Sequence, residues 1–266
     1  MNKNTNLCIS IASSPGDFGA QFHNQAYKDL QMNWVYLPRK VTTTSQLKSV
    51  ISGVRSLNIK GCSVSMPFKE RVIEFIDELD SSAETTGAVN TILNSDGTLK
   101  GFNTDLFGAK EAISKLDLMK KGVLIVGAGG VAKAVIKAVS ELGGDITITN
   151  RTDKSSKDLA SQMNIEFIPW DQLNSSSGYM LINATSVGMN NKNEMIVSEK
   201  TLDGFEVIMD VVIYPRLTKL IRVSSENGKK IINGIEMCVY QAAKQFKIYT
   251  GKEVPQSLIA SILEEG

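Results

Sequence analysis

The stretch 123–135 constrains the fold more than any other part of the sequence. It begins with four apolar residues, Val-Leu-Ile-Val, which are typical of a buried parallel strand. Gly127, Gly129 and Gly130 then form a tight turn, and the small and apolar residues after them predict a helix packed on a sheet. Such a turn brings backbone N–H groups and the positive end of a helix dipole up to a phosphate. With Ala132 in place of a third glycine, the pattern is the small-residue variant of the dinucleotide-binding fingerprint.

The residues after the next expected strand indicate which dinucleotide would bind. About twenty residues past the glycine turn, an NAD-binding domain carries an acidic residue for the adenosine ribose. Here the sequence has Asn150, followed by Arg151 and Thr152. A guanidinium group is well suited to a 2′-phosphate. The sequence therefore predicts NADP(H) rather than NAD(H), the alternative being a solvated basic turn.

The composition excludes several other classes of protein. The 266-residue chain is 42% hydrophobic and 21% charged, with a net charge of +1, so no nucleic-acid partner is expected. No stretch approaches the roughly 18 consecutive apolar residues of a membrane span, and no signal-peptide segment is present, so we expect a cytoplasmic protein. Cys8, Cys62 and Cys238 are far apart and lack C-x-x-C spacing, which predicts neither disulfides nor a metal site.

Strands and helices alternate along the chain, which favours an α/β fold with two domains. In the first domain we expect strands at 7–12, 34–37 and 61–66, helices at 21–30, 45–57 and 69–79, and a hairpin of 88–93 and 98–102 closed by 94–97. In the second we expect a doubly wound sheet with strands at 123–126, 145–149, 166–168, 180–183 and 207–211.

The predicted domains are discontinuous in sequence. Residues 1–104 with 242–266 would form a substrate-binding α/β domain, and residues 105–241 a Rossmann NADP-binding domain. Two helices, 233–250 and 255–263, would return the chain to the first domain.

Hydride transfer to a carbonyl requires a group that gives or takes a proton at the oxygen. The sole histidine, His23, lies on an early helix without an acidic neighbour, so a packing role is favoured. Lys69 follows a strand that ends at Pro67 and is able to project into a cleft, although a solvated lysine is the alternative. Asp105 is either a second candidate or an acid placed to complement a helix dipole.

Eight short phrases together resemble the shikimate dehydrogenase family. They occur in the family's order over almost the whole chain: 66–70 (MPFKE), 88–91 (AVNT), 101–105 (GFNTD), 127–130 (GAGG), 150–152 (NRT), 183–189 (NATSVGM), 210–215 (DVVIYP) and 233–241 (NGIEMCVYQ). Such a number of ordered phrases is far more specific than one glycine motif.

The resemblance implies roles for individual residues. Lys69 would be the catalytic lysine and Asp105 its partner, the pair passing a proton to or from the substrate oxygen. The implied substrate contacts are Ser14, Ser65, Asn90 and Gln241. The implied cofactor contacts are Gly127, Gly129 and Gly130 at the pyrophosphate, Asn150, Arg151 and Thr152 at the adenosine phosphate, and Thr185, Gly234 and Met237 around the ribose and nicotinamide.

The sequence departs from the family where the substrate carboxylate would be held. The family's Ser-x-Ser-Pro is Ala12-Ser-Ser-Pro15 here, so that Ser14 aligns and Ser13 is shifted by one. The usual Asn-Val-Thr is Ser63-Val-Ser65. These changes resemble a divergent branch of shikimate dehydrogenase-like proteins.

We therefore expect an NADPH-dependent enzyme, a monomer or homodimer, that reversibly reduces 3-dehydroshikimate to shikimate or acts on a related cyclic polyol acid. A quinate or aminoshikimate dehydrogenase is the alternative among enzymes. The alternative of another class is an NADP(H)-binding regulatory protein, against which the retention of Lys69 and Asp105 argues. The 183–186 and 103–105 phrases disfavour a folate-like substrate.

Overall fold

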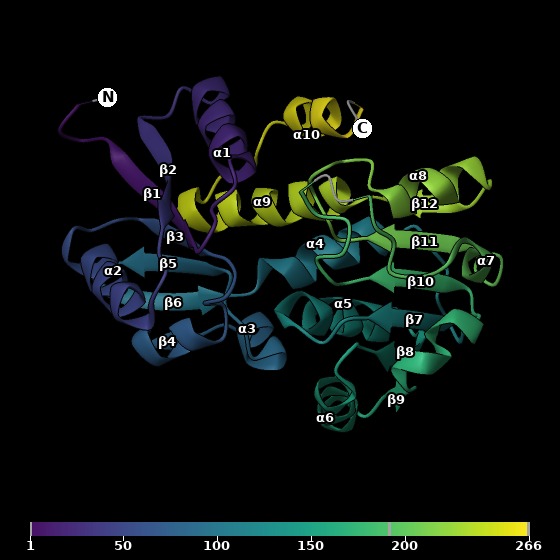
Figure 1. Ribbon diagram of the computed structural model, residues 1–266. Helices are drawn as coiled ribbons and strands as arrows, with labels where there is room; N and C mark the ends of the chain where they lie inside the picture. The colour runs from purple at the N-terminus through teal and green to yellow at the C-terminus, as the bar shows by residue number, and fades with distance from the viewer. Residues whose placement is uncertain (1, 191–192, 265–266) are drawn as a thin grey trace. The chain divides into compact units, whose positions relative to one another are not determined.

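The computed structural model describes residues 2–190 and 193–264 and divides into two compact units. One unit holds the chain up to Thr104 together with Gln241–Glu264, and the other holds Asp105–Tyr240. The divisions fall within helices α4 (Thr104–Ile113) and α9 (Gly234–Thr250). Gln241 thus belongs to the first unit, whereas the sequence-based boundary put it in the second. Each unit is built on its own six-stranded sheet (Figure 1).

The sheet of the first unit is mixed. Its strand order is β2 (Trp34–Lys40), β1 (Asn6–Ala12), β3 (Gly61–Val64), β5 (Thr91–Ser95), β6 (Thr98–Phe102) and β4 (Glu78–Leu79). β1 is parallel to β2 and β3, whereas β5 runs antiparallel to both β3 and β6. The carboxyl ends of β1 and β3 therefore lie side by side, and the chain enters β5 at that same edge.

Both faces of this sheet are covered because its strands alternate in what they bury. Ile9 and Ile11 pack in one cluster with Leu47 and Ile51 of α2 (Thr44–Ser56). On the other face, α1 (Phe18–Asp29) and the second half of α9 meet through Tyr27 and Phe246, whose ring centroids are 5.3 Å apart. α10 (Gln256–Glu264) follows α9. The alternation is what a sheet with helices on both faces requires.

The β5–β6 hairpin predicted from the sequence is confirmed. Asp96 and Gly97 both have positive φ, 52° and 95°, as a type I′ turn requires. Asn94 accepts the backbone N–H of Gly97 through its side-chain oxygen, which closes the turn. The Asn-Ser-Asp-Gly sequence was therefore a reliable signal.

The helix predicted over 69–79 is wrong. The chain instead forms a short 3-10 turn, η1 (Arg71–Phe75), then β4, then the short helix α3 (Ser81–Thr86). The Asp77 carboxylate accepts the backbone N–H of Leu99 at 2.7 Å, and the N–H of Asp77 donates to the Leu99 carbonyl. These two bonds hold the segment extended beside β6, so that pairing with the sheet edge outweighs helix propensity.

The sheet of the second unit is parallel throughout. Its order is β9 (Glu166–Phe167), β8 (Asp145–Thr149), β7 (Gly122–Val126), β10 (Met180–Asn183), β11 (Val207–Asp210) and β12 (Lys230–Ile232). Numbered along this unit, the strands follow the order 3-2-1-4-5-6, which defines the Rossmann fold. The strand order reverses between β7 and β10, and ligands of such sheets bind at that point, outside the carboxyl ends of the strands.

Helices cover both faces of this parallel sheet. Val123 and Ile125 of β7 pack with α4, α5 (Gly130–Glu141) and α6 (Asp153–Met163). The alternate residues, Leu124 and Val126, pack with η2 (Trp170–Ser175), α7 (Glu199–Leu202) and α8 (Lys219–Glu226). The doubly wound α/β class predicted from the sequence is confirmed, although α7, α8 and β12 were not predicted.

Candidate functional site

The glycine turn lies at the switch point of the second sheet. Gly127 follows β7, has a φ of 122°, and donates its N–H to the carbonyl of Thr149 at the end of β8. A Cβ on Gly127 would lie 2.8 Å from the carbonyl oxygen of Ala184, just past β10. A side chain is therefore excluded by both backbone conformation and space. The turn brings the ends of β7, β8 and β10 together.

The start of α5 is open to a ligand. Gly129 caps this 12-residue helix with an extended backbone, and nothing lies within 4 Å of the position that its Cβ would take. Neither a side-chain cap nor an acidic residue in the first turn occupies the helix end. Gly130 is the first helical residue, and Ala132 is fully buried against the core. Backbone N–H groups and a positive helix end are thus presented where an anion fits.

The corner after β8 carries the basic group predicted for the cofactor. The Asn150 side chain donates to the Thr152 carbonyl at 3.3 Å, which bends the chain into α6. Arg151 and Thr152 are both exposed at this corner. Because β8 is the neighbour of β7, the guanidinium group is carried at the same edge of the sheet as the glycine turn.

A buried carboxylate joins the loops after β10 and β11. One Asp210 oxygen accepts from the Asn183 amide and from the Val212 N–H, both at 3.0 Å, and the other accepts the Thr218 hydroxyl at 2.7 Å. Asn183 in turn accepts the N–H and hydroxyl of Thr185, at 3.1 and 2.6 Å. Burial raises the pKa of Asp210 to about 6, against the lowering effect of these hydrogen bonds. The sequence showed this aspartate only as part of a family phrase.

Gly234 and Met237 stand at the start of α9. A Cβ on Gly234 would overlap the carbonyl of Val212, so the helix packs directly on the end of β11. The Met237 side chain is 5% exposed and belongs to the core cluster of the second unit, with Val211 packed alongside. Both residues therefore lie at the carboxyl edge of the sheet, Gly234 as a close backbone contact and Met237 within the core.

In the first unit a cluster of amides and hydroxyls surrounds Asn90. Its Oδ1 accepts the backbone N–H of Thr104 at 2.8 Å, and its Nδ2 donates to the Thr104 hydroxyl at 3.0 Å. The Oε1 of Gln241 lies 3.4 Å from Asn90 Nδ2 and 3.2 Å from Thr104 Oγ1. Two residues predicted to bind substrate, 151 positions apart in sequence, are thus brought together.

Lys69 belongs to the first unit, and Asp105 is the first residue of the second unit. The carbonyl of Lys69 accepts the N–H of Val89, the residue before Asn90, at 2.7 Å. Asp105 follows Thr104 directly, in the first turn of α4, and is 6% exposed. The lysine side chain is half-buried.

Ser14 and Ser65 lie beyond the adjacent ends of β1 and β3. The N–H of Ser13 donates to the Met66 carbonyl at 3.1 Å, and the N–H of Ser65 donates to Ile11 at 2.9 Å. These bonds keep the two serine segments next to each other at the carboxyl edge of the first sheet. Both Ser14 and Ser65 are exposed.

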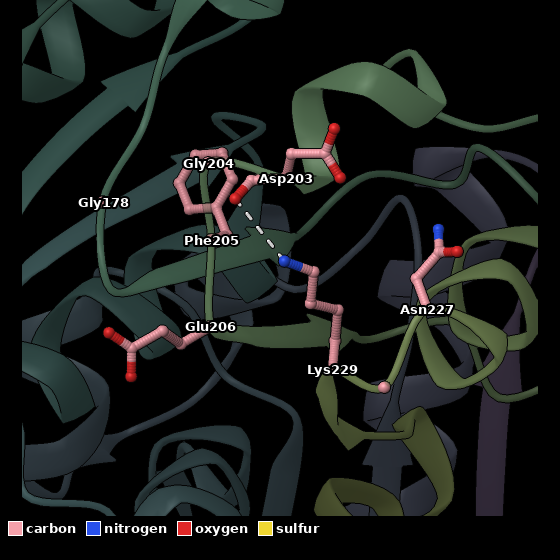
Figure 2. Close-up of a pocket in the computed structure, with 8 residues that line it drawn as sticks. Gly178, Asp203, Gly204, Phe205, Glu206, Asn227 and Lys229 are labelled. Carbon is pink, nitrogen blue, oxygen red and sulfur yellow. Dashed lines mark hydrogen bonds between the residues drawn. The ribbon is translucent and has the colours of Figure 1, made fainter.

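A separate cavity of about 450 Å³ lies in the second unit and is shown in Figure 2. Its lining includes Gly178, Phe205 and Lys229, which precede β10, β11 and β12, respectively. The Lys229 ammonium donates to the Asp203 carbonyl at 3.5 Å. This cavity is therefore at the amino edge of the sheet, opposite to the glycine turn.

Two kinds of feature are absent from the described residues. Within 2–190 and 193–264, no helix is long and apolar enough to span a membrane. Over the same part of the chain, no group of three or more His, Cys, Asp or Glu side chains is arranged to hold a metal ion.

Fold and site together define a two-domain α/β protein whose second domain is of the Rossmann type. Three family models match its sequence: the shikimate dehydrogenase substrate binding domain at residues 13–92, shikimate / quinate 5-dehydrogenase at 109–211, and the shikimate 5′-dehydrogenase C-terminal domain at 234–264. The chain belongs to the shikimate dehydrogenase family of oxidoreductases.

Individual relatives match over nearly the full length. A shikimate dehydrogenase-like protein of Haemophilus influenzae is 39% identical over 98% of this chain and 96% of its own. The structure of shikimate 5-dehydrogenase from Thermus thermophilus with NADP(H) and shikimate has a TM-score of 0.87 at 26% identity, covering 98% of each chain. That of the Listeria monocytogenes enzyme with shikimate and NAD has a TM-score of 0.86 at 32% identity, covering 99% of this chain and 98% of its own.

Proposed function

We propose that this protein catalyses the NADP(H)-dependent, reversible reduction of 3-dehydroshikimate to shikimate, or of a closely related cyclic polyol acid. The observation that carries the proposal is that one chain, a member of this family, contains two features. One is a glycine turn at the switch point of a Rossmann sheet, and the other is a buried cluster of amides around Asn90. A hydroxylated acid is the class of substrate that such amides bind.

NADP(H) fits the groups that the second unit presents. Gly127, Gly129 and Gly130 would accept the pyrophosphate, because Gly129 leaves open space in front of the N-terminus of α5. Asn150, Arg151 and Thr152 would hold the adenosine 2′-phosphate, and a guanidinium pairs with phosphate far better than with a neutral ribose. Thr185, Gly234 and Met237 would border the ribose and nicotinamide. When bound, the cofactor supplies or accepts the hydride.

The substrate would be held by the first unit. Asn90 and Gln241 would contact ring hydroxyls, with Asn90 fixed by Thr104. Ser14 and Ser65 would hold the carboxylate, since their two segments are bound side by side at the end of the sheet. Hydroxyls are suited to a carboxylate because each donates one hydrogen bond.

Lys69 and Asp105 would move the proton at the substrate oxygen. In reduction the carbonyl carbon receives the hydride and the oxygen receives a proton from the lysine side chain; in oxidation the alcohol proton passes back. Asp105 would act as the partner of Lys69 in this proton transfer. His23 is not suited to this proton transfer, because it is completely buried and burial lowers its pKa to about 3.

The test is a spectrophotometric assay of the purified protein with NADP⁺ or NAD⁺ against shikimate, quinate and aminoshikimate. We expect the highest kcat/KM for shikimate with NADP⁺. A higher kcat/KM for quinate would favour quinate dehydrogenation, which the name of the second matching family model also includes. Tight NADPH binding in a fluorescence titration, without turnover of any of the three acids, would instead support the regulatory protein.

A further inference from the structure

Gln245 lies one turn after Gln241 on α9, outside the phrases that carry the family resemblance. It is 3% exposed, and its Nε2 lies within hydrogen-bond distance of three oxygens. These are Thr91 Oγ1 at 2.9 Å, Ser63 Oγ at 3.2 Å and the Asn90 backbone carbonyl at 3.2 Å. An amide nitrogen donates and cannot accept. Thr91 must therefore accept from Gln245 and send its own hydroxyl proton elsewhere.

The Thr91 proton goes to the side chain of Asn90. Thr91 Oγ1 donates to Asn90 Oδ1 at 2.8 Å, and this oxygen also accepts the backbone N–H of Thr104. A reversed Asn90 amide would set its NH₂ group against that N–H, two donors facing each other in a buried site. The amide is thus held with its oxygen inward and with Nδ2 toward Thr104 Oγ1 and Gln241 Oε1.

The same direction of donation continues to Gln241. The Thr104 hydroxyl lies 3.1 Å from Asn90 Oδ1 and 3.2 Å from Gln241 Oε1. Because Asn90 Oδ1 already accepts two bonds, we assign the hydroxyl proton to Gln241 Oε1. The carbonyl ends of both Asn90 and Gln241 are therefore engaged inside the unit as acceptors. Gln245, Thr91, Asn90, Thr104 and Gln241 form one ordered chain of donors, here called the amide relay.

We propose that Gln245 is a positioning residue that fixes the amide of Asn90 through Thr91, so that Asn90 Nδ2 faces Thr104 Oγ1 and Gln241 Oε1 and holds Gln241 in place for the substrate. This inference rests on the proposed function, in which Asn90 and Gln241 contact the substrate. Without the Gln245 N–H, the Thr91 hydroxyl is able to turn to Thr104 Oγ1, 3.2 Å away, and Asn90 Oδ1 loses one of its partners.

A double-mutant cycle tests the relay. Gln245→Met keeps the length of the side chain without a donor, and Thr91→Val keeps the shape without the hydroxyl. Each is expected to raise the KM for shikimate about 5–10-fold, as the loss of one hydrogen bond does, with kcat and the KM for NADP⁺ changed less than twofold. The KM of the double variant is expected to be no higher than that of the single variant with the higher KM, because the two side chains act through one path. Thr91→Ser, which keeps the hydroxyl, is expected to have the wild-type KM.

The matched control is Asn94→Ala. Asn94 is a buried amide on β5, 2% exposed, and it donates to the Val54 carbonyl at 2.8 Å, away from the relay. This variant is expected to lower Tm and leave the KM for shikimate unchanged. The inference would be overturned if the KM for shikimate stayed unchanged in Gln245→Met. It would also be overturned if the KM increases of the two relay variants multiplied in the double variant, or if Asn94→Ala raised this KM as much as they do.

A second measurement separates this inference from the proposed function. In protein labelled with ¹⁵N-asparagine, the Asn90 side-chain amide is identified by its loss in Asn90→Asp. Its signals are expected to shift and to exchange faster with solvent in Gln245→Met and Thr91→Val, while those of Asn94 stay in place. If wild-type protein turns over no shikimate, the proposed function fails and these signals still decide the relay; unmoved signals in Gln245→Met would reject it.

Discussion

The candidate cofactor site of the second unit and the candidate substrate site of the first unit are built in different ways. At the glycine turn the surface is made of backbone, with Gly127 in close contact with Ala184 and open space in front of Gly129. Around Asn90 the surface is made of buried side chains, in which each amide or hydroxyl is bonded to another. The first arrangement depends on side chains that are absent, and the second on side chains that are paired.

This difference separates the expected effects of substitution. Adding a single carbon to the glycine turn changes the fold or blocks the cofactor, because the backbone itself makes the contacts. Removing one group from the Asn90 cluster leaves a buried polar atom without a partner and changes the substrate affinity. A comparison of Tm, cofactor affinity and substrate KM across variants should therefore sort residues by region.

The largest expected effect is on the substrate side. Lys69→Ala should lower kcat by about 100-fold or more, because a positioned proton donor is lost, while the Kd for NADPH stays within about twofold. Steady-state kinetics and a fluorescence titration measure the two quantities. Lys48→Ala, which removes an exposed lysine of α2, is the control and should behave as wild type. An unchanged kcat in Lys69→Ala would remove this lysine from the mechanism.

The next effect distinguishes two glycines of one turn. Gly127→Ala places a Cβ 2.8 Å from the Ala184 carbonyl at a φ of 122°, and should cost roughly 3 kcal/mol of unfolding free energy. Gly129→Ala has free space and an extended backbone, so it should keep the wild-type Tm and yet weaken NADPH binding. Thermal unfolding and NADPH titration of both variants give the answer. Equal losses of Tm in the two variants would contradict the structural difference between Gly127 and Gly129, and unchanged NADPH binding in Gly129→Ala would contradict its place at the cofactor.

Sequence patterns predicted the fold correctly where the local signals agree with the tertiary structure. The strand-turn-helix at 123–135 and the hairpin closed by Asp96 and Gly97 follow from glycine and from period-two burial. His23 was expected to be a packing residue, and it is fully buried with its ring stacked on Tyr36 at 4.5 Å. The segment 69–79 failed because its extended form depends on a bond to Leu99, which no local pattern contains.

The candidate site shows the same limit. The family phrases pointed to Asn90 and Gln241, but their contact depends on α9 packing against β5. Gln245 carried no signal, because its proposed role depends on residues that are its neighbours only in space. In the sequence Asp210 was one residue of a predicted strand, and only the structure shows its burial and its bond to Thr218.

A smaller and selective effect is expected at the cofactor rim. Arg151→Ala should raise the Kd for NADP⁺ about 10-fold, as the loss of a charge-assisted phosphate contact does, and leave the Kd for NAD⁺ within about twofold. NAD⁺ is thus the internal control, because it lacks only the 2′-phosphate. Calorimetric titration of both cofactors measures the ratio. Equal losses for the two would place Arg151 away from the phosphate.

The smallest expected effect is on the pH dependence of stability. It arises because the unit that carries the glycine turn also contains a buried side-chain network, centred on the carboxylate of Asp210. The pKa of Asp210 is raised to about 6, above the ordinary value of about 3.9, so between these values the folded protein binds more protons than the unfolded chain. Its contribution to stability is full below about pH 4 and is lost as the pH rises through 6. Between pH 5 and pH 8 this loss amounts to about 1 kcal/mol.

Asp210→Asn should remove this contribution, while the opposite contribution of His23, whose pKa is lowered by burial, remains. The Asn oxygen is able to accept from Asn183 and Val212, and its NH₂ group to donate to the Thr218 hydroxyl, so the variant resembles the protonated carboxyl. Urea unfolding of the variant and wild type at several pH values measures the difference, with the exposed Asp158→Asn of α6 as the control that keeps the wild-type slope. A pH dependence of Asp210→Asn equal to that of the wild type would show that Asp210 is not the group that titrates in this range.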